Sequence, residues 1–194
     1  MRVGLTGGIA SGKSLVSATL GDLGAVVIDN DLLARRVVEP GSLGLDMVAQ
    51  RFGPGVLTQQ GALDRKRLGA IVFNDPLALA DLNAIIHPLI KQASAQIESS
   101  APGQAVVVHD IPLLVESGQA GDFDLVVVVD VPPEIQLARL LRRDALDIAA
   151  ASARIAAQIT RRARLEVADV VIDNSGSRQD TVDQVDALWR RLTS

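Results

Sequence analysis

Short runs of aliphatic residues recur along the chain, and most of them end in polar or acidic residues. These runs predict five strands, at residues 3–5, 25–28, 105–108, 125–129 and 170–172. Nearly continuous Val, Leu and Ile are typical of strands buried on both faces, which form parallel sheets flanked by helices. The pattern therefore favours a doubly wound α/β core.

Helical periodicity fills most of the remaining chain. It predicts helices at residues 13–23, within 134–167, and at 179–192. Residues 32–104 lack a clear buried strand and are interpreted as several short helices, because turn signals separate them at Pro40-Gly41, Gly53-Pro54-Gly55, Asp75-Pro76 and His87-Pro88. We therefore expect a helical insertion within the α/β core.

Composition narrows the class of protein. The chain has 194 residues, of which 48% are hydrophobic and 2% aromatic, and this fits one compact domain with small insertions. The absence of cysteine excludes disulfides and thiolate metal sites, and it suits a reducing cytosol. No apolar run approaches the roughly 20 residues needed to cross a bilayer, and the chain starts without a signal-peptide pattern. We expect a cytoplasmic protein with no membrane partner.

Positive charge is concentrated in one segment. Residues 139–164 include seven arginines and two aspartates, although the whole chain has a net charge of -4. A nucleic-acid partner is disfavoured, because aromatic stacking residues are missing and the rest of the chain is acidic. The segment suits a compact polyphosphate ligand, and a solvated helix face is the alternative interpretation.

A glycine-rich motif follows the first predicted strand. Residues 7–14, GGIASGKS, match G-x-x-x-x-G-K-[ST] and directly precede a predicted helix. In such a loop the glycines let backbone N–H groups surround a phosphate at the helix N-terminus. Lys13 would reach the β- and γ-phosphates and Ser14 would bind Mg²⁺. Leu15 stands where many such loops carry a second hydroxyl, which the metal does not require. The motif predicts nucleotide binding.

The motif alone leaves the reaction open. A Ras-like GTPase would need an N-K-x-D segment, which is absent, and the chain is short for a motor ATPase, so a small-molecule kinase is favoured. Asp31 follows the second strand, where a carboxylate could orient an attacking hydroxyl. It could also cap the helix that follows.

Further polar residues stand at strand ends or within the arginine-rich segment. Asp110 ends the third strand and could hold magnesium, a task for which Asp29 competes. Arg139 and Arg143 lie four apart, so a helix would present both on one face towards ATP phosphates. His87 is interpreted either as a helix-terminal histidine or as a substrate contact.

Several segments together resemble dephospho-coenzyme A kinases. They are LTGGI leading into GKS, IDND at residues 28–31, IHP at 86–88, DIPLLVE at 110–116, the helix at 139–143, Ala157-Gln158, and VVIDN at 170–174. The likeness extends over nearly the whole chain. Asn30 departs from the small residue usual between the two aspartates, although both carboxylates remain.

The resemblance implies transfer of a phosphoryl group from ATP, with Mg²⁺, to the ribose 3′-hydroxyl of dephospho-CoA. It implies catalytic roles for Lys13, for Asp31 as base and for Arg139, an acceptor site with Asp31, Arg35 and His87, and a metal site with Ser14 and Asp110. The nucleotide site would comprise Gly8, Ile9, Ala10, Ser11, Gly12, Lys13, Ser14, Leu15, Arg143 and, near the adenine, Asn174.

The resemblance also implies a domain plan. Residues 1–29, 105–138 and 166–194 would form a three-layer P-loop core, residues 30–104 the CoA-binding insertion, and residues 139–165 a basic helical lid. We expect a monomer or small homo-oligomer with no nucleic-acid partner. Two rivals remain from the residues themselves: a similar kinase acting on a nucleoside monophosphate, gluconate or shikimate, and a nucleotide-dependent switch that acts through a partner.

Overall fold

The computed structural model describes residues 1–194, which fold as two compact units. The first unit comprises Met1–Asp29 and Ala101–Ser194, and the second comprises Asn30–Ser100. Residues 139–165 lie within the first unit. No helix in either unit has both the length and the apolar character needed to cross a membrane.

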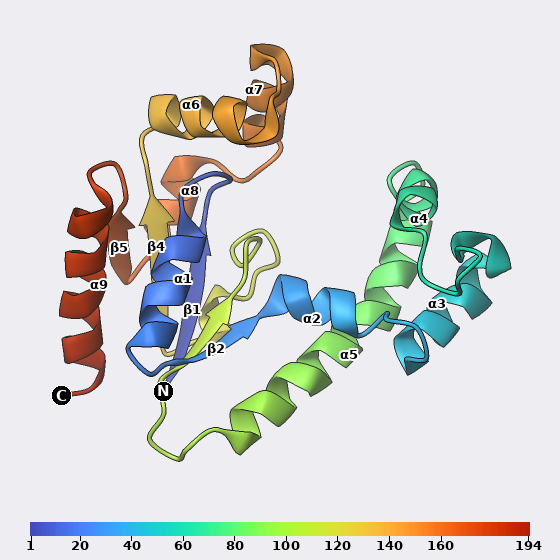
Figure 1. Ribbon diagram of the computed structural model, residues 1–194, viewed down its shortest axis with the longest axis horizontal. Coiled ribbons are helices and arrows are strands. Elements are labelled where there is room, and N and C mark those ends of the chain that lie inside the picture. The colour runs from blue at the N-terminus through green and yellow to red at the C-terminus, as the bar shows by residue number, and fades with distance from the viewer. The chain divides into compact units, whose positions relative to one another are not determined.

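A five-stranded parallel sheet forms the centre of the first unit (Figure 1). Its order is β2-β3-β1-β4-β5, and its strands are β1 (Arg2–Gly7), β2 (Val26–Asp29), β3 (Val107–Asp110), β4 (Leu125–Asp130) and β5 (Val170–Asp173). The predicted α/β P-loop fold with a parallel sheet is confirmed. Because all strands are parallel, their carboxyl ends share one edge of the sheet, and ligands of open α/β sheets bind beyond that edge.

Helices α1 (Lys13–Asp22) and α9 (Arg178–Leu192) pack against each other and against one face of the sheet (Figure 1). Their side chains Leu20 and Val185 are fully buried with Val127 of β4. The opposite face is covered by the segment after β3, which contains the short helix η2 (Ala120–Asp122) and supplies Leu114, and by α8 (Arg161–Glu166). Apolar side chains therefore cover both faces, which explains the valine-rich strands.

Two further helices complete the first unit, α6 (Pro133–Asp144) and α7 (Ile148–Ala156). Together with α8 they form three helices in the stretch where the sequence predicts helical structure, within residues 134–167. Ala145, at φ 49°, ends α6 in the left-handed region. Asp147 and Thr160 then each accept a hydrogen bond from a backbone N–H and start α7 and α8. Short capping side chains thus divide the segment.

The second unit is helical, as expected. It contains α2 (Asn30–Arg36), α3 (Leu43–Phe52), η1 (Pro54–Val56), α4 (Arg65–Val72) and α5 (Pro76–Ser100) around a small aliphatic cluster. The expected break at His87-Pro88 is wrong, because α5 continues through Pro88. A proline inside a helix removes one backbone hydrogen bond, and the rest of this 25-residue helix supplies enough further bonds to continue past it.

Candidate active site

The turn at residues 7–14 leads from β1 directly into α1. The backbone N–H of Ser11 donates to the Gly8 carbonyl at 3.0 Å, and the N–H of Leu15 donates to the Gly12 carbonyl at 2.9 Å. No side chain caps the N-terminus of α1. The first N–H groups of this helix therefore have no capping partner, and a helix N-terminus in that condition favours an anion.

Gly12 is the position where this turn requires glycine. Its φ of 90° lies in the left-handed region, and a Cβ there would overlap the side-chain nitrogen of Asn174. Buried Asn174 donates from that nitrogen to the Ser11 carbonyl at 2.7 Å and accepts a hydrogen bond from the hydroxyl of Thr181 at 2.7 Å. Both polar groups of the Asn174 amide are thus bonded within the protein, and the amide nitrogen anchors the turn through the Ser11 carbonyl.

Arg139 of α6 is bound beside the same turn. Its Nη1 donates to the Ser11 carbonyl at 3.4 Å and its Nη2 donates to the Asn174 carbonyl at 2.8 Å. Neither partner carries a charge, and no carboxylate pairs with this guanidinium. The structure therefore places an uncompensated positive charge beside the glycine-rich turn, where it can attract an anion.

Lys13 and Asp110 form an ion pair at the start of α1. Both side chains are largely buried, with exposed fractions of 17% and 8%. Asp110 ends β3, and its register partner on β2 is Asp29, so two acidic residues end neighbouring strands beside Lys13. Ser14, the second residue of α1, is exposed. The structure therefore pairs the predicted lysine with Asp110, one of the two candidate strand-end carboxylates.

Arg143 has a different environment from Arg139. Its Nε donates to Asp144 at 2.7 Å, and Arg154 of α7 shares that carboxylate at 2.8 Å. The hydrogen bond between Arg143 and Asp144 raises the pKa of the guanidinium and lowers the pKa of the carboxyl. In this conformation the charge of Arg143 is compensated, and the side chain is half exposed rather than bound at the turn.

The predicted acceptor-binding residues all belong to the second unit. Asp31 and Arg35 are exposed and lie four residues apart on α2, and exposed His87 lies on α5 just before Pro88. Helix α2 begins at Asn30, so Asp31 lies within its first turn rather than before it. A carboxylate in the first turn interacts favourably with the helix dipole, and the exposed Asp31 side chain is accessible to a ligand.

Comparison with known proteins identifies the family. A sequence model of the dephospho-CoA kinases matches residues 1–180 of the chain. A dephospho-CoA kinase of Streptomyces avermitilis is 51% identical over 192 residues, which cover 99% of this chain and 94% of the relative. The chain belongs to the dephospho-CoA kinase family. The resemblance noted from the sequence motifs is thereby confirmed.

Solved structures agree with this membership. A crystal structure from Thermus thermophilus superimposes with a TM-score of 0.86 at 32% identity, covering 100% of this chain and 98% of that one. A dephospho-CoA kinase from Campylobacter jejuni gives a TM-score of 0.75 at 30% identity, with 99% and 96% covered. As members of this family are kinases that use ATP, the chain is a transferase with a nucleotide site.

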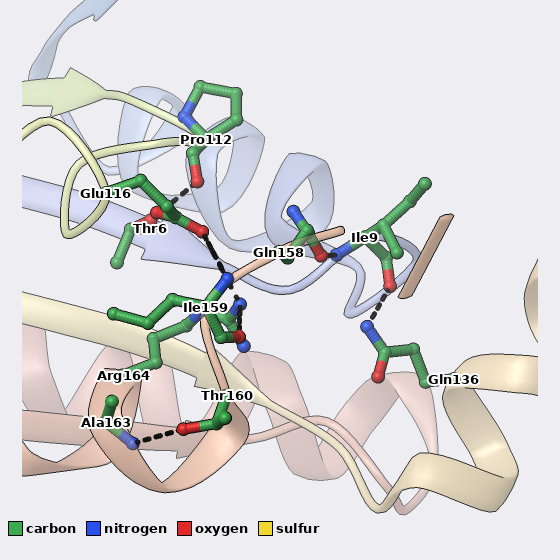
Figure 2. A network of polar contacts seen from close by, with 10 residues as sticks. All are labelled: Thr6, Ile9, Pro112, Glu116, Gln136, Gln158, Ile159, Thr160, Ala163 and Arg164. Carbon is green, nitrogen blue, oxygen red and sulfur yellow. Dashed lines mark hydrogen bonds and ion pairs between the residues drawn. The ribbon is translucent and has the colours of Figure 1, made fainter. Parts of the chain in front are cut away.

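The contacts of several polar side chains were not predicted from the sequence, although Gln158 lies in the Ala157-Gln158 segment that carries the resemblance. Gln136 and Gln158 bind the backbone of Ile9 (Figure 2), and Arg161 pairs with Asp130 through its Nη2 at 2.6 Å. Asp130 ends β4, and strand-end acids were the available signal for that pair. Glutamine amides carry no comparable signal, because their partners here are backbone atoms distant in the sequence.

Proposed function

We propose that this protein transfers the γ-phosphoryl group of ATP to the 3′-hydroxyl of dephospho-CoA, giving coenzyme A and ADP in the final step of CoA synthesis. The single observation that carries the proposal is the uncapped, glycine-dependent turn before α1 with Lys13 at the first helical position, in a chain of this family. Such a turn suits a polyphosphate tail, because its N–H groups and the lysine converge on one anion.

Lys13, Arg139 and the backbone of residues 8–15 bind the triphosphate in this proposal. Arg139 has only carbonyl partners, so it keeps its charge for the phosphoryl group as negative charge develops there. Arg143, in the arginine-rich segment, would also bind the triphosphate after its hydrogen bond to Asp144 is replaced by one to a phosphate. The turn from Asn174 to Gly176 would flank the adenine, while the Asn174 amide anchors the backbone of the glycine-rich turn.

The residues present fit magnesium delivered with ATP. Oxygen donors are available from the exposed hydroxyl of Ser14 and from Asp110, with Asp29 beside it in register, and hard oxygen ligands are those that Mg²⁺ prefers. No group of three or more His, Cys, Asp or Glu side chains is placed to hold a metal by itself. Phosphate oxygens would complete the shell, and the bound ion would neutralise charge on the β- and γ-phosphates.

Asp31 is the proposed general base for the acceptor hydroxyl, with Arg35 and His87 binding dephospho-CoA. Two features support this assignment. All three side chains are exposed, and Asp31 lies two residues after Asp29, the last residue of β2. A carboxylate that accepts a hydrogen bond from the hydroxyl orients the attacking oxygen and takes up its proton.

Two segments take larger roles in the proposal. Residues 30–104 would hold the CoA portion of the acceptor, and the arginine-rich residues 139–165 would act as a lid. A lid over ATP excludes water, which would otherwise accept the phosphoryl group. We further propose a cytoplasmic monomer or small homo-oligomer without a nucleic-acid partner, which fits the chain's lack of cysteine and its net negative charge.

Coupled ADP formation tests the acceptor. The enzyme with ATP and Mg²⁺ is offered dephospho-CoA beside AMP, dTMP, gluconate and shikimate, and ADP release is followed with each. Dephospho-CoA should stimulate ADP release by orders of magnitude over the acceptor-free rate. Equal stimulation by another acceptor would move the activity to that substrate. Stimulation by none would support a nucleotide-dependent switch instead.

A further inference from the structure

Ile9 in the glycine-rich turn is bound at both of its backbone groups by glutamine side chains. Its N–H donates to Oε1 of Gln158 at 2.7 Å, and its carbonyl accepts from Nε2 of Gln136 at 2.8 Å. Figure 2 shows the two amides reaching Ile9 from separate segments. Gln136 lies on α6, whereas Gln158 lies between α7 and α8. A residue just before the arginine-rich segment and a residue within it therefore meet at one residue of the turn.

The backbone that presents Gln158 is itself anchored. The N–H of Ile159 donates to the Glu116 carboxylate at 3.1 Å, and Nη2 of Arg164 donates to the Ile159 carbonyl at 3.0 Å (Figure 2). Arg164 is buried, which lowers the pKa of its guanidinium, and Glu116 at 3.9 Å opposes that shift. Since Glu116 belongs to the segment after β3, Gln158 is fixed relative to the sheet.

The residue after Ile9 shows why such support is needed. Ala10 has a φ of 60°, in the left-handed region that residues with a Cβ seldom adopt. The Ile9 carbonyl belongs to the peptide that enters Ala10, so the Gln136 bond opposes the rotation that would relieve this residue. Strained backbone of this kind persists where its surroundings overdetermine it.

The glycine before Ile9 fits the same arrangement. A Cβ at Gly8 would lie 2.7 Å from Nε2 of Gln136 and 3.1 Å from Nη1 of Arg164. The Gln136 amide and the Arg164 guanidinium therefore occupy the space that a side chain at Gly8 would need. The turn, both glutamines and the buried arginine consequently pack as one polar cluster.

We propose that Gln136 and Gln158 are positioning residues that hold the phosphate-binding turn in its strained, ligand-ready form and thereby set the affinity for ATP. The inference rests on the proposed function, since it concerns how the turn binds ATP. The glutamines touch the loop backbone, so they act through the loop. Without them, ATP binding would also have to restore the left-handed conformation of Ala10.

Kinetics on single variants test this role. Gln136→Ala and Gln158→Ala should each raise the KM for ATP by about 5-fold, the effect of one lost hydrogen bond, with the KM for dephospho-CoA unchanged. Gln179→Ala is the matched control, because its amide bonds only to Asp183 on the exposed face of α9. That control should leave both constants at wild-type values.

A second substitution distinguishes positioning from general stability. Ala10→Gly should lower the KM for ATP of Gln136→Ala and Gln158→Ala back towards the wild-type value, because glycine adopts the left-handed region without strain. Relief of the strain at Ala10 also stabilises the folded state, so a general folding defect would be repaired for both substrates and in the melting temperature together, whereas a positioning defect is repaired in the KM for ATP alone. Thermal unfolding of every variant is measured alongside.

Glutamate substitutions separate the two hydrogen bonds. Gln158→Glu keeps an oxygen to accept from the Ile9 N–H, whereas Gln136→Glu sets a carboxylate against the Ile9 carbonyl. Both add the same charge near the phosphates, so their difference reports on the hydrogen bond. Gln136→Glu should therefore raise the KM for ATP several-fold more than Gln158→Glu.

Unchanged KM values for ATP in both alanine variants would overturn the inference, and so would parallel rises for both substrates that Ala10→Gly fails to repair. Calorimetric titration with ATP and Mg²⁺ keeps this result separate from the proposed function. Wild-type protein that binds ATP in a glutamine-dependent way, yet forms no ADP with dephospho-CoA, would support the positioning role and refute the proposed acceptor.

Discussion

The two units of the chain hold their polar residues in different ways. Around the glycine-rich turn, side chains bind backbone atoms distant in the sequence: Gln158 lies 149 residues from Ile9, and Asn174 lies 163 from Ser11. In the helical unit, the caps Ser42 and Asp64 bind backbone three residues ahead. The comparison teaches that the turn is shaped by tertiary structure, whereas these helix starts follow local rules.

The extent of apolar burial also differs between the two units. In the first unit, Leu20 and Val127 are fully buried between α1 and the sheet. The helical unit has a smaller cluster and leaves Phe73 and Leu77 exposed by 82% and 77%. Apolar burial is therefore more extensive in the unit that contains the proposed ATP site, and substitutions in each unit can test this contrast.

The largest expected effect separates the proposed roles of the two units. Asp31→Asn, in the helical unit, should lower kcat by ~10²–10⁴-fold, typical for loss of a general base, with ATP affinity nearly intact. Lys13→Ala, in the first unit, should lower kcat and also weaken ATP binding, because the lysine would contact the phosphates before and during transfer. Steady-state kinetics with calorimetric ATP titration measures both effects.

Retention of the wild-type kcat by Asp31→Asn would remove this carboxylate from the chemical step. Arg36→Gln is its control, since Arg36 lies on the same helix without an assigned role and should keep full activity. Wild-type ATP binding in Lys13→Ala would contradict the phosphate-binding assignment of the turn.

The next largest effect concerns the buried core. Leu20→Ala removes a fully buried side chain between α1 and the sheet, and it should lower the free energy of unfolding by about 3 kcal/mol. Leu43→Ala changes the same residue type on α3, where the side chain is 65% exposed, and should stay within about 0.5 kcal/mol of wild type. Urea denaturation gives both values, and equal losses would refute the contrast.

The smallest effect concerns a local helix start. The Ser42 hydroxyl accepts from the Leu45 N–H at 3.2 Å and donates to the Val37 carbonyl at 2.9 Å. Ser42→Ala should lower the free energy of unfolding by about 1 kcal/mol. Ser42→Asp keeps the acceptor, so in the same denaturation experiment it should recover part of the loss. Equal deficits in the alanine and aspartate variants would show that the bond to Val37 dominates.

Local sequence pattern predicted the elements that carry the proposed ATP site. The succession of β1, turn and α1 was correct because an aliphatic run, a spaced glycine motif and helical periodicity each report on neighbouring residues. The expected break at Pro88 was wrong for the complementary reason. Local sequence rules consider the hydrogen bond lost at a proline, but they do not include the helical turns on either side that keep α5 continuous.

The candidate site was predictable in its residue types more than in its contacts. The motif and strand ends indicated Lys13 and Asp110, and the structure pairs them. The support of the turn by Asn174 and the two glutamines was not predictable, because those bonds link segments that approach only after the sheet forms. The predicted base and the acceptor contacts on α2 and α5 stay predictions.

The ion pair between Lys13 and Asp110 has a consequence for turnover. In the proposed function, an incoming triphosphate would replace the aspartate as the partner of the lysine, so binding would exchange one ionic contact for another. After phosphoryl transfer leaves the shorter diphosphate, the carboxylate would be placed to pair with the ammonium group again. Under that proposal the ion pair would favour release of ADP.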